Sequence, residues 1–169
     1  DHALFAAPEW GALMQCAGRH EHDSLFAKAR NQLGTVGSGN HYVDIFYDED
    51  EMVWIGVHFG SRGFGHKTAS GFLAQAQGKK WGEKYDEGGM DALPTLIEAA
   101  SDLGQGYIEA MTLAGDYAYA GRDCVVNEVL DILGTTSQYE VHNHHNYAWR
   151  ERHFDQDAWV VRKGCTPAF

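Results

Sequence analysis

The sequence predicts an α+β fold in which a β-hairpin or small sheet forms the core and helices flank it. Apolar residues recur with helical periodicity over 105–133, which predicts one long helix that ends at Gly134. Two β-branched and aromatic runs surround four consecutive acidic residues, which predicts a hairpin. Helices and strands are mixed without a regular βαβ rhythm, so an α+β fold is favoured over a doubly wound sheet.

The predicted elements follow one another without a linker or an internal repeat, which indicates a single domain over 1–169. Strands are predicted where β-branched and aromatic residues concentrate, and turns where glycines do. In order, we expect helices over 7–16 and 23–31, a glycine-rich turn over 34–40, strands over 41–47 and 52–58, a helix over 66–77, a loop over 78–94, the long helix over 105–133, a strand over 138–142, a short helix or turn over 146–152, and a strand over 158–162.

Composition narrows the class of protein. The chain has 169 residues, of which 44% are hydrophobic and 22% charged, and this excludes a disordered chain. Its net charge of −11 argues against bulk electrostatic capture of nucleic acid, although a local cationic groove stays compatible with it. No apolar run reaches the ~18 residues of a membrane span. The three cysteines form no C-x-x-C pair, so we expect a reducing, cytoplasmic location. The chain begins with Asp1 rather than Met, and we expect it to be a piece of a longer protein.

Two histidines, His41 and His58, stand at the ends of the predicted hairpin strands. If the hairpin is symmetric about the peptide bond between Glu49 and Asp50, the two imidazoles face each other with Cβ atoms ~5 Å apart. Imidazoles at that separation can share a divalent metal ion. A one-residue slip would instead send them to opposite faces. The alternative is that both are hydrogen-bonded structural residues.

A second histidine cluster covers 142–146, and one of its members could complete a three-histidine metal site. Periodicity does not choose among His142, His144 and His145, and a polar turn is the alternative. The glycine-rich segments 34–40 and 60–65 are candidate anion cradles, with Arg62 offering a planar fork for phosphate. The segment Arg162-Lys163-Gly164 lies at the end of the last predicted strand, where its side chains could reach a cleft or simply be solvated.

Four stretches together resemble the RtcB-type RNA-splicing ligases. Gln32 to Asp44 reads QLGTVGSGNHYVD, similar to the family pattern QLGTxGxGNHFIE, and His58 to Gly63 reads HFGSRG, similar to HSGSRG. His144 to Tyr147 reads HHNY, and Val161 to Gly164 reads VRKG, similar to the RKGA element. The resemblance covers about 30–65 and 138–168, in the family's order, with weaker similarity between them.

The resemblance implies the family's fold and its reaction. These enzymes join RNA ends that carry a 2′,3′-cyclic phosphate or a 3′-phosphate to a 5′-hydroxyl, using GTP, two Mn²⁺ ions and a guanylylated histidine. Carried over by motif, His41, His58 and His145 are expected manganese ligands. The implied partners are therefore GTP and RNA ends, such as transfer RNA halves or broken RNA, and no membrane.

The same carry-over assigns the remaining site residues. Asn40 is expected to contact the GTP phosphates and, with Arg62, to act in catalysis. Tyr42 and Asp44 are expected beside the nucleotide, as is Lys163 in the RKGA element. Arg62 is expected to bind a phosphate, that of the RNA end.

The sequence departs from the family's pattern in several places. Asp44 replaces the usual Glu, Phe59 a frequent Ser, and Cys165 an Ala. The family's D-x-G-C-G-M motif has no counterpart, and the histidine that becomes guanylylated belongs beyond Phe169. We therefore expect the chain to be the central part of a longer catalytic domain, unable to guanylylate itself alone. The alternatives are a non-catalytic metal- or nucleotide-binding module of the same fold, and a metal-dependent phosphoesterase.

Overall fold

The computed structural model describes residues 2–88 and 93–165 and divides the chain into two compact units. The first unit is Asp1–Leu133 and the second is Gly134–Phe169. Helices and two antiparallel hairpins are both present, which confirms the α+β class. Whether the two units are parts of one catalytic domain stays a prediction. Among the described residues, no helix combines the length and apolarity needed to cross a bilayer.

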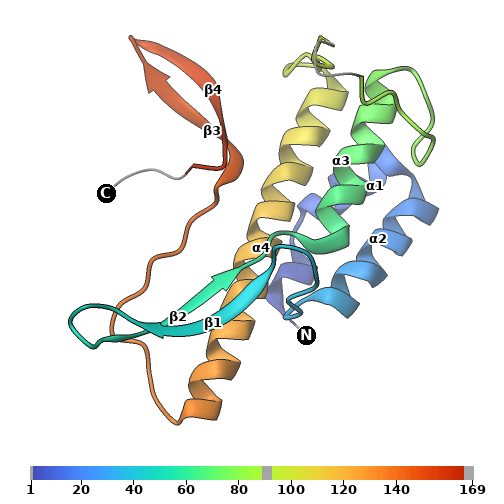
Figure 1. Ribbon diagram of the computed structural model, residues 1–169. Coiled ribbons are helices and arrows are strands. Elements are labelled where there is room, and N and C mark those ends of the chain that lie inside the picture. Colours follow the sequence, from blue (N-terminus) through green and yellow to red (C-terminus); the bar gives the residue numbers. More distant parts are fainter. Residues whose placement is uncertain (1, 89–92, 166–169) are drawn as a thin grey trace. The chain divides into compact units, whose positions relative to one another are not determined.

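The first unit is built mainly from helices (Figure 1). All four predicted helices are confirmed, although each begins or ends a few residues from its expected bound, and a short 3₁₀ helix precedes them. The helices are η1 (Ala3–Ala6), α1 (Glu9–Ala17), α2 (Arg19–Gln32), α3 (Arg62–Ala76) and α4 (Asp102–Leu133). The left-handed backbone of Gly18, at φ 83°, separates α1 from α2 and lets α2 begin earlier than predicted.

The hydrophobic core of the first unit lies among these helices. Trp10, Phe64, Phe72 and Tyr117 are buried there, together with smaller residues from η1, α1, α2 and α4. Every member of the buried cluster is helical, so the expected sheet core is wrong for the described residues. A two-stranded hairpin has too little surface to form a core of its own and must pack against other elements.

The first predicted hairpin is confirmed, but its predicted register is wrong. Strands β1 (Tyr42–Tyr47) and β2 (Val53–His58) pair antiparallel with Tyr42, not His41, opposite His58. The loop has an odd number of residues, because Asp48 lies opposite Met52 and donates its N–H to the Met52 carbonyl at 3.1 Å. Glu51 takes a left-handed conformation at φ 63°, as the last residue of a three-residue hairpin loop commonly does.

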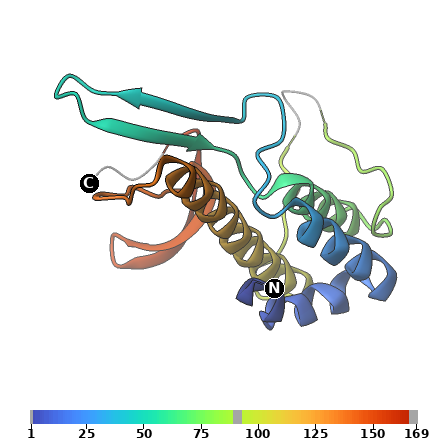
Figure 2. The same cartoon turned by 90° about the horizontal axis from the view of Figure 1, so that it is seen from below.

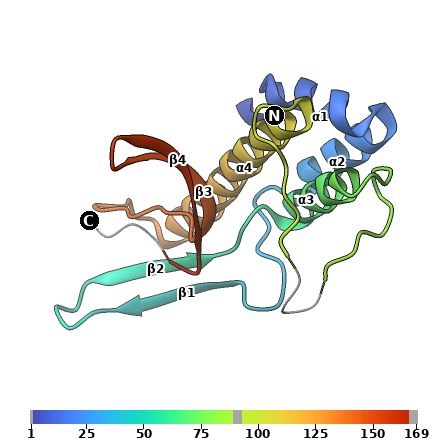
Figure 3. The same ribbon diagram turned by 90° about the horizontal axis from the view of Figure 1, so that it is seen from above.

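The Asp48 carboxylate stabilises this loop. It accepts hydrogen bonds from the N–H groups of Asp50 at 3.0 Å and Met52 at 2.9 Å, and from Trp54 Nε1 at 2.7 Å. These bonds lower the pKa of Asp48, with the Trp54 bond contributing most. The loop lies at the far end of the hairpin, whereas the open end joins α2 and α3 (Figures 2 and 3).

The second unit contains a hairpin that the sequence did not predict. Strand β3 (Asn146–His153) occupies the segment expected to be a helix or turn, and β4 (Gln156–Lys163) extends the predicted last strand. Residues 138–142, predicted as a strand, form none. The hairpin turns at Phe154 and Asp155, at φ 49° and 62°, which is the backbone of a type I′ turn without the usual glycine.

Candidate functional site

His41 and His58 come together at the open end of the β1–β2 hairpin. Their ring centroids lie 6.3 Å apart, with 51° between the ring planes. Tyr42 stacks on His58, with centroids 5.4 Å apart and planes at 11°. His41 and His58 are therefore close together, as predicted, although the predicted register is wrong. His41 precedes β1, so the alternation of side chains along a strand does not determine which way it points.

The two imidazoles fit a divalent cation as donors. A histidine nitrogen lies about 2.1 Å from a bound ion, so rings that share one ion have centroids within roughly 6 Å of each other. The observed 6.3 Å is slightly longer, so the two rings would have to move closer together by a few tenths of an ångström to share one ion. Both side chains are partly buried, which leaves an ion access to them.

Arg62 closes one side of this histidine pair. Its backbone is left-handed, at φ 56°, where it begins α3. The side-chain Nη1 lies 3.1 Å from His41 Nδ1, and Nε donates to Thr35 Oγ1 at 3.5 Å. A guanidinium has only donors, so His41 Nδ1 accepts this bond, and the neutral ring carries its proton on Nε2.

The first glycine-rich segment holds the Arg62 guanidinium. A Cβ on Gly37, whose φ is 95°, would collide with Arg62 Nη1, Nη2 and Cζ, so the absence of a side chain makes room for the fork. The segment was predicted to cradle an anion, but here Gly37 contacts a cation. An anion bound at this segment would therefore lie beside the Arg62 guanidinium.

Gln32, at the end of α2, joins the two glycine-rich segments. Its carbonyl accepts hydrogen bonds from the Thr35 N–H at 3.1 Å and from Thr35 Oγ1 at 2.6 Å. Its side-chain Oε1 accepts from the Gly63 N–H at 3.1 Å. One residue thus fixes both the threonine that contacts Arg62 and the residue that follows Arg62.

Helix α4 packs against the residue that precedes the second glycine-rich segment. The buried Arg122 donates from Nη1 to the carbonyl of Phe59 at 2.8 Å, and Phe59 is itself buried. Burial lowers the pKa of Arg122. Gly121 lies against the Phe59 ring, and Gly34 lies against Cys124, so α4 contacts both segments. Sequence reasoning missed Arg122, although it is the only basic residue in α4 and could have been noticed for that reason.

The other site residues predicted for the first unit lie in β1 or directly before it. Asn40 directly precedes His41 and is exposed. Asp44 is exposed, opposite Gly56, and shares a strand face with Tyr42 because strand side chains alternate. Tyr42 is 46% exposed.

His145 and Lys163 lie in the second unit, at the open end of its hairpin. The carbonyl of His145 accepts the Gly164 N–H at 2.7 Å, and Asn146 Oδ1 accepts the same N–H at 2.9 Å. Lys163 pairs with Asn146 in the ladder. The HHNY and RKG elements, nearly twenty residues apart, are thereby brought side by side.

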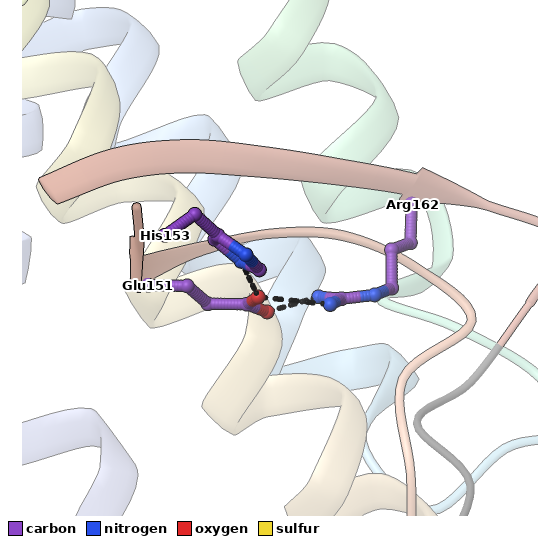
Figure 4. A network of polar contacts seen from close by, with 3 residues as sticks. All are labelled: Glu151, His153 and Arg162. Carbon is purple, nitrogen blue, oxygen red and sulfur yellow. Dashed lines mark hydrogen bonds and ion pairs between the residues drawn. The ribbon is translucent and has the colours of Figure 1, made fainter. Parts of the chain in front are cut away.

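Arg162 is engaged within the second hairpin (Figure 4). Its guanidinium binds both carboxylate oxygens of Glu151 and lies 5.1 Å from the Trp149 ring centroid. His153 Nε2 lies 2.7 Å from the same carboxylate. The Arg162 hydrogen bonds, followed by that of His153, lower the pKa of Glu151 to about 2. Of the RKG element, Lys163 rather than Arg162 therefore remains for a ligand.

Known proteins match the chain along nearly its whole length. The family model described as "tRNA-splicing ligase RtcB" matches residues 2–169. The chain belongs to this family. RNA-splicing ligase RtcB of Escherichia coli (strain K12) is 33% identical over 147 residues, which cover 80% of this chain and 36% of that protein. The tRNA-splicing ligase RtcB of Pyrobaculum aerophilum is 32% identical over 176 residues, covering 85% and 35%, respectively. That of Nanoarchaeum equitans is 33% identical over 174 residues, covering 84% and 35%. The chain thus spans about a third of the length of these RtcB relatives.

Proposed function

We propose that this chain is part of an RNA ligase that joins 2′,3′-cyclic phosphate or 3′-phosphate ends to 5′-hydroxyl ends with Mn²⁺ and GTP. The observation that carries the proposal is the approach of His41 and His58 beside Arg62, within a chain that an RtcB family model matches over residues 2–169. The relatives are named RNA- or tRNA-splicing ligases, which supports the same reaction.

In this proposal, His41, His58 and His145 are manganese ligands. Imidazole nitrogens suit Mn²⁺ as they suit other divalent ions. A divalent ion beside a phosphate neutralises charge on the attacking and leaving oxygens. The stacking of Tyr42 on His58 restricts the ring rotation of that ligand. Arg122 and Gln32 fix the backbone that follows it, at Phe59 and Gly63.

The remaining residues bind the nucleotide and the RNA end. We assign Asn40, Tyr42, Asp44 and Lys163 to GTP. Asn40 precedes β1, and Tyr42 and Asp44 share one exposed face of that strand. Arg62 binds the terminal phosphate through its planar fork, which matches two phosphate oxygens at once. The histidine that becomes guanylylated lies outside this chain.

RNA joining by the full-length protein that contains this sequence tests the proposal. Two labelled RNA fragments, one with a 3′-phosphate and one with a 5′-hydroxyl, are incubated with GTP and Mn²⁺. We expect a joined product from the wild type and none from His41→Ala or His58→Ala. His20→Ala is the matched control, because its side chain is 93% exposed, and it is expected to join RNA normally.

Other outcomes distinguish the alternatives. Hydrolysis of the phosphate end without GTP would identify a metal-dependent phosphoesterase. Binding of Mn²⁺ or GTP without joining or hydrolysis would identify a non-catalytic module. For the 169-residue chain alone, incubated with labelled GTP and Mn²⁺, we expect no covalent GMP adduct, and a stable adduct would contradict the placement of the nucleophile outside it.

A further inference from the structure

We propose that Arg62 and a divalent metal ion compete for His41, so that metal binding releases the Arg62 guanidinium for a phosphate. The inference rests on the proposed function, since it takes His41 as a metal ligand. It adds a coupling to the site: metal binding makes the phosphate-binding arginine available, and phosphate binding to the arginine frees His41 for the metal.

The competition follows from the tautomer of His41. Arg62 Nη1 lies 3.1 Å from Nδ1, and because arginine cannot accept a hydrogen bond, Nδ1 must supply the lone pair. A neutral imidazole then has its proton on Nε2. A metal bound at Nδ1 would displace the arginine directly. A metal bound at Nε2 would move the proton to Nδ1 and leave Arg62 facing an N–H group.

Arg62 differs from the groups that orient metal-bound histidines. Such a histidine almost always donates its second N–H to a carboxylate, a backbone carbonyl or water. Arg62 offers donors only and cannot play this part. Its contact therefore stabilises the form of His41 that has no nitrogen free for a metal.

The structure also provides a place that holds the arginine in this position. Gly37 gives the guanidinium room, Thr35 Oγ1 accepts from Nε, and Gln32 fixes Thr35. The left-handed backbone of Arg62 directs the side chain back across the loop that precedes β1, towards His41. These contacts all lie within the first unit.

Competition for one histidine couples two ligands. If metal binding frees Arg62, the bound metal raises the affinity for phosphate, and bound phosphate must raise the affinity for the metal by the same factor. One hydrogen bond is at stake, which predicts a coupling of about 2- to 10-fold.

The test measures Mn²⁺ binding to the full-length protein by calorimetry, with and without inorganic phosphate. We expect Arg62→Met to bind Mn²⁺ about 2- to 10-fold more tightly than the wild type and to lose the coupling to phosphate. Thr35→Val, which keeps Arg62 but removes one of its partners, is expected to shift affinity in the same direction by less. Arg19→Met, at an exposed position on α2, is the matched control and is expected to change neither quantity.

Loss of the repulsion between Arg62 and Mn²⁺ could by itself tighten Mn²⁺ binding in Arg62→Met. Nitrogen-15 spectra of the histidines separate the two causes, because that repulsion does not set the tautomer of His41 in the absence of metal. Without added metal, we expect wild-type His41 to be protonated on Nε2 and Arg62→Met to show a mixture of tautomers. Mn²⁺ affinity that is unchanged or weaker in both Arg62→Met and Thr35→Val would overturn the competition. If His41→Ala binds Mn²⁺ as tightly as the wild type does, the proposed metal site itself is wrong. That failure is separate from a failure of the competition.

Discussion

The two hairpins carry their family motifs in the same way but are held by different forces. In both, the residues of interest lie at the open end, far from the turn: His41 and His58 in the first hairpin, His145 and Lys163 in the second. The first open end is fixed by contacts with helices: Arg122 of α4 donates to the buried Phe59 carbonyl after β2, and Arg62 of α3 bonds to His41 before β1. The second is fixed by its own ladder, by the partly buried Glu151–Arg162 pair and by the exposed Arg150–Asp157 pair. Site geometry in the first hairpin should therefore depend on distant helical residues, and in the second only on the hairpin itself.

The largest effect is expected from the buried arginine below the first hairpin. Arg122→Met leaves the Phe59 carbonyl without its 2.8 Å donor, and a buried unsatisfied carbonyl costs about 2 kcal/mol. We expect this loss in the free energy of unfolding from denaturant titration. Arg150→Met in the second hairpin is the control, since its side chain is 68% exposed and its ion pair with Asp157 is weak. Equal losses in both variants would contradict the comparison.

A smaller effect is expected at the glycine that faces Arg62. Gly37→Ala places a side chain on a left-handed backbone, which costs about 1–2 kcal/mol, and also collides with the guanidinium. Gly39→Ala at φ 80° bears the same strain but meets nothing within 4 Å. We expect similar losses of stability in the two variants, whereas only Gly37→Ala should disturb the His41 ring resonances. Disturbance by both would show that the loop moves as a whole.

The turns of the hairpins provide the next comparison. Phe154 and Asp155 both have positive φ without glycine, and Phe154 is fully exposed, so replacing the pair by Asn-Gly relieves strain and removes no packing. We expect a gain of about 1 kcal/mol in the second hairpin, measured by amide exchange across β3 and β4. Glu51→Gly in the first hairpin relieves one strained residue instead of two, and about half the gain is expected. Protection that falls in either variant would contradict the assigned turns.

The sequence predicted the parts of the fold that local patterns encode. Helix α4 and the existence of the first hairpin follow from periodicity and residue type. The register of that hairpin could not be predicted, because it depends on Asp48 capturing three donors in an odd-numbered loop. The second hairpin was missed for two reasons. Its turn, Phe154–Asp155, lacks the glycine that is typical of a two-residue hairpin turn. In addition, Glu151 and Arg152 are more typical of a helix than of a strand.

The candidate site was predictable only as far as its chemical groups. His41, His58 and Arg62 were identified, and the structure brings these three together. Their supports were not identified. Gln32 acts through a side-chain oxygen on Gly63, and Arg122 acts across 63 positions of sequence, and neither contact leaves a periodic signal.

The smallest effect is expected from the Glu151 network of the second hairpin as pH falls. The pKa of Glu151 is lowered from 4.5 to about 2, chiefly by Arg162. A carboxylate whose folded pKa is depressed stabilises the fold above its unfolded value, and that contribution is lost as pH falls from about 4.5 through about 2. We expect amide protection across β3 and β4 to decline in that window in the wild type but not in Glu151→Gln, which has no charge to lose. Because the pair is only partly buried, with side chains 24% and 26% exposed, added salt should weaken the decline. The buried Phe59–Arg122 contact of the first unit should respond to neither salt nor this range of pH. A wild-type profile that matches Glu151→Gln would show that the second open end is held by the ladder alone.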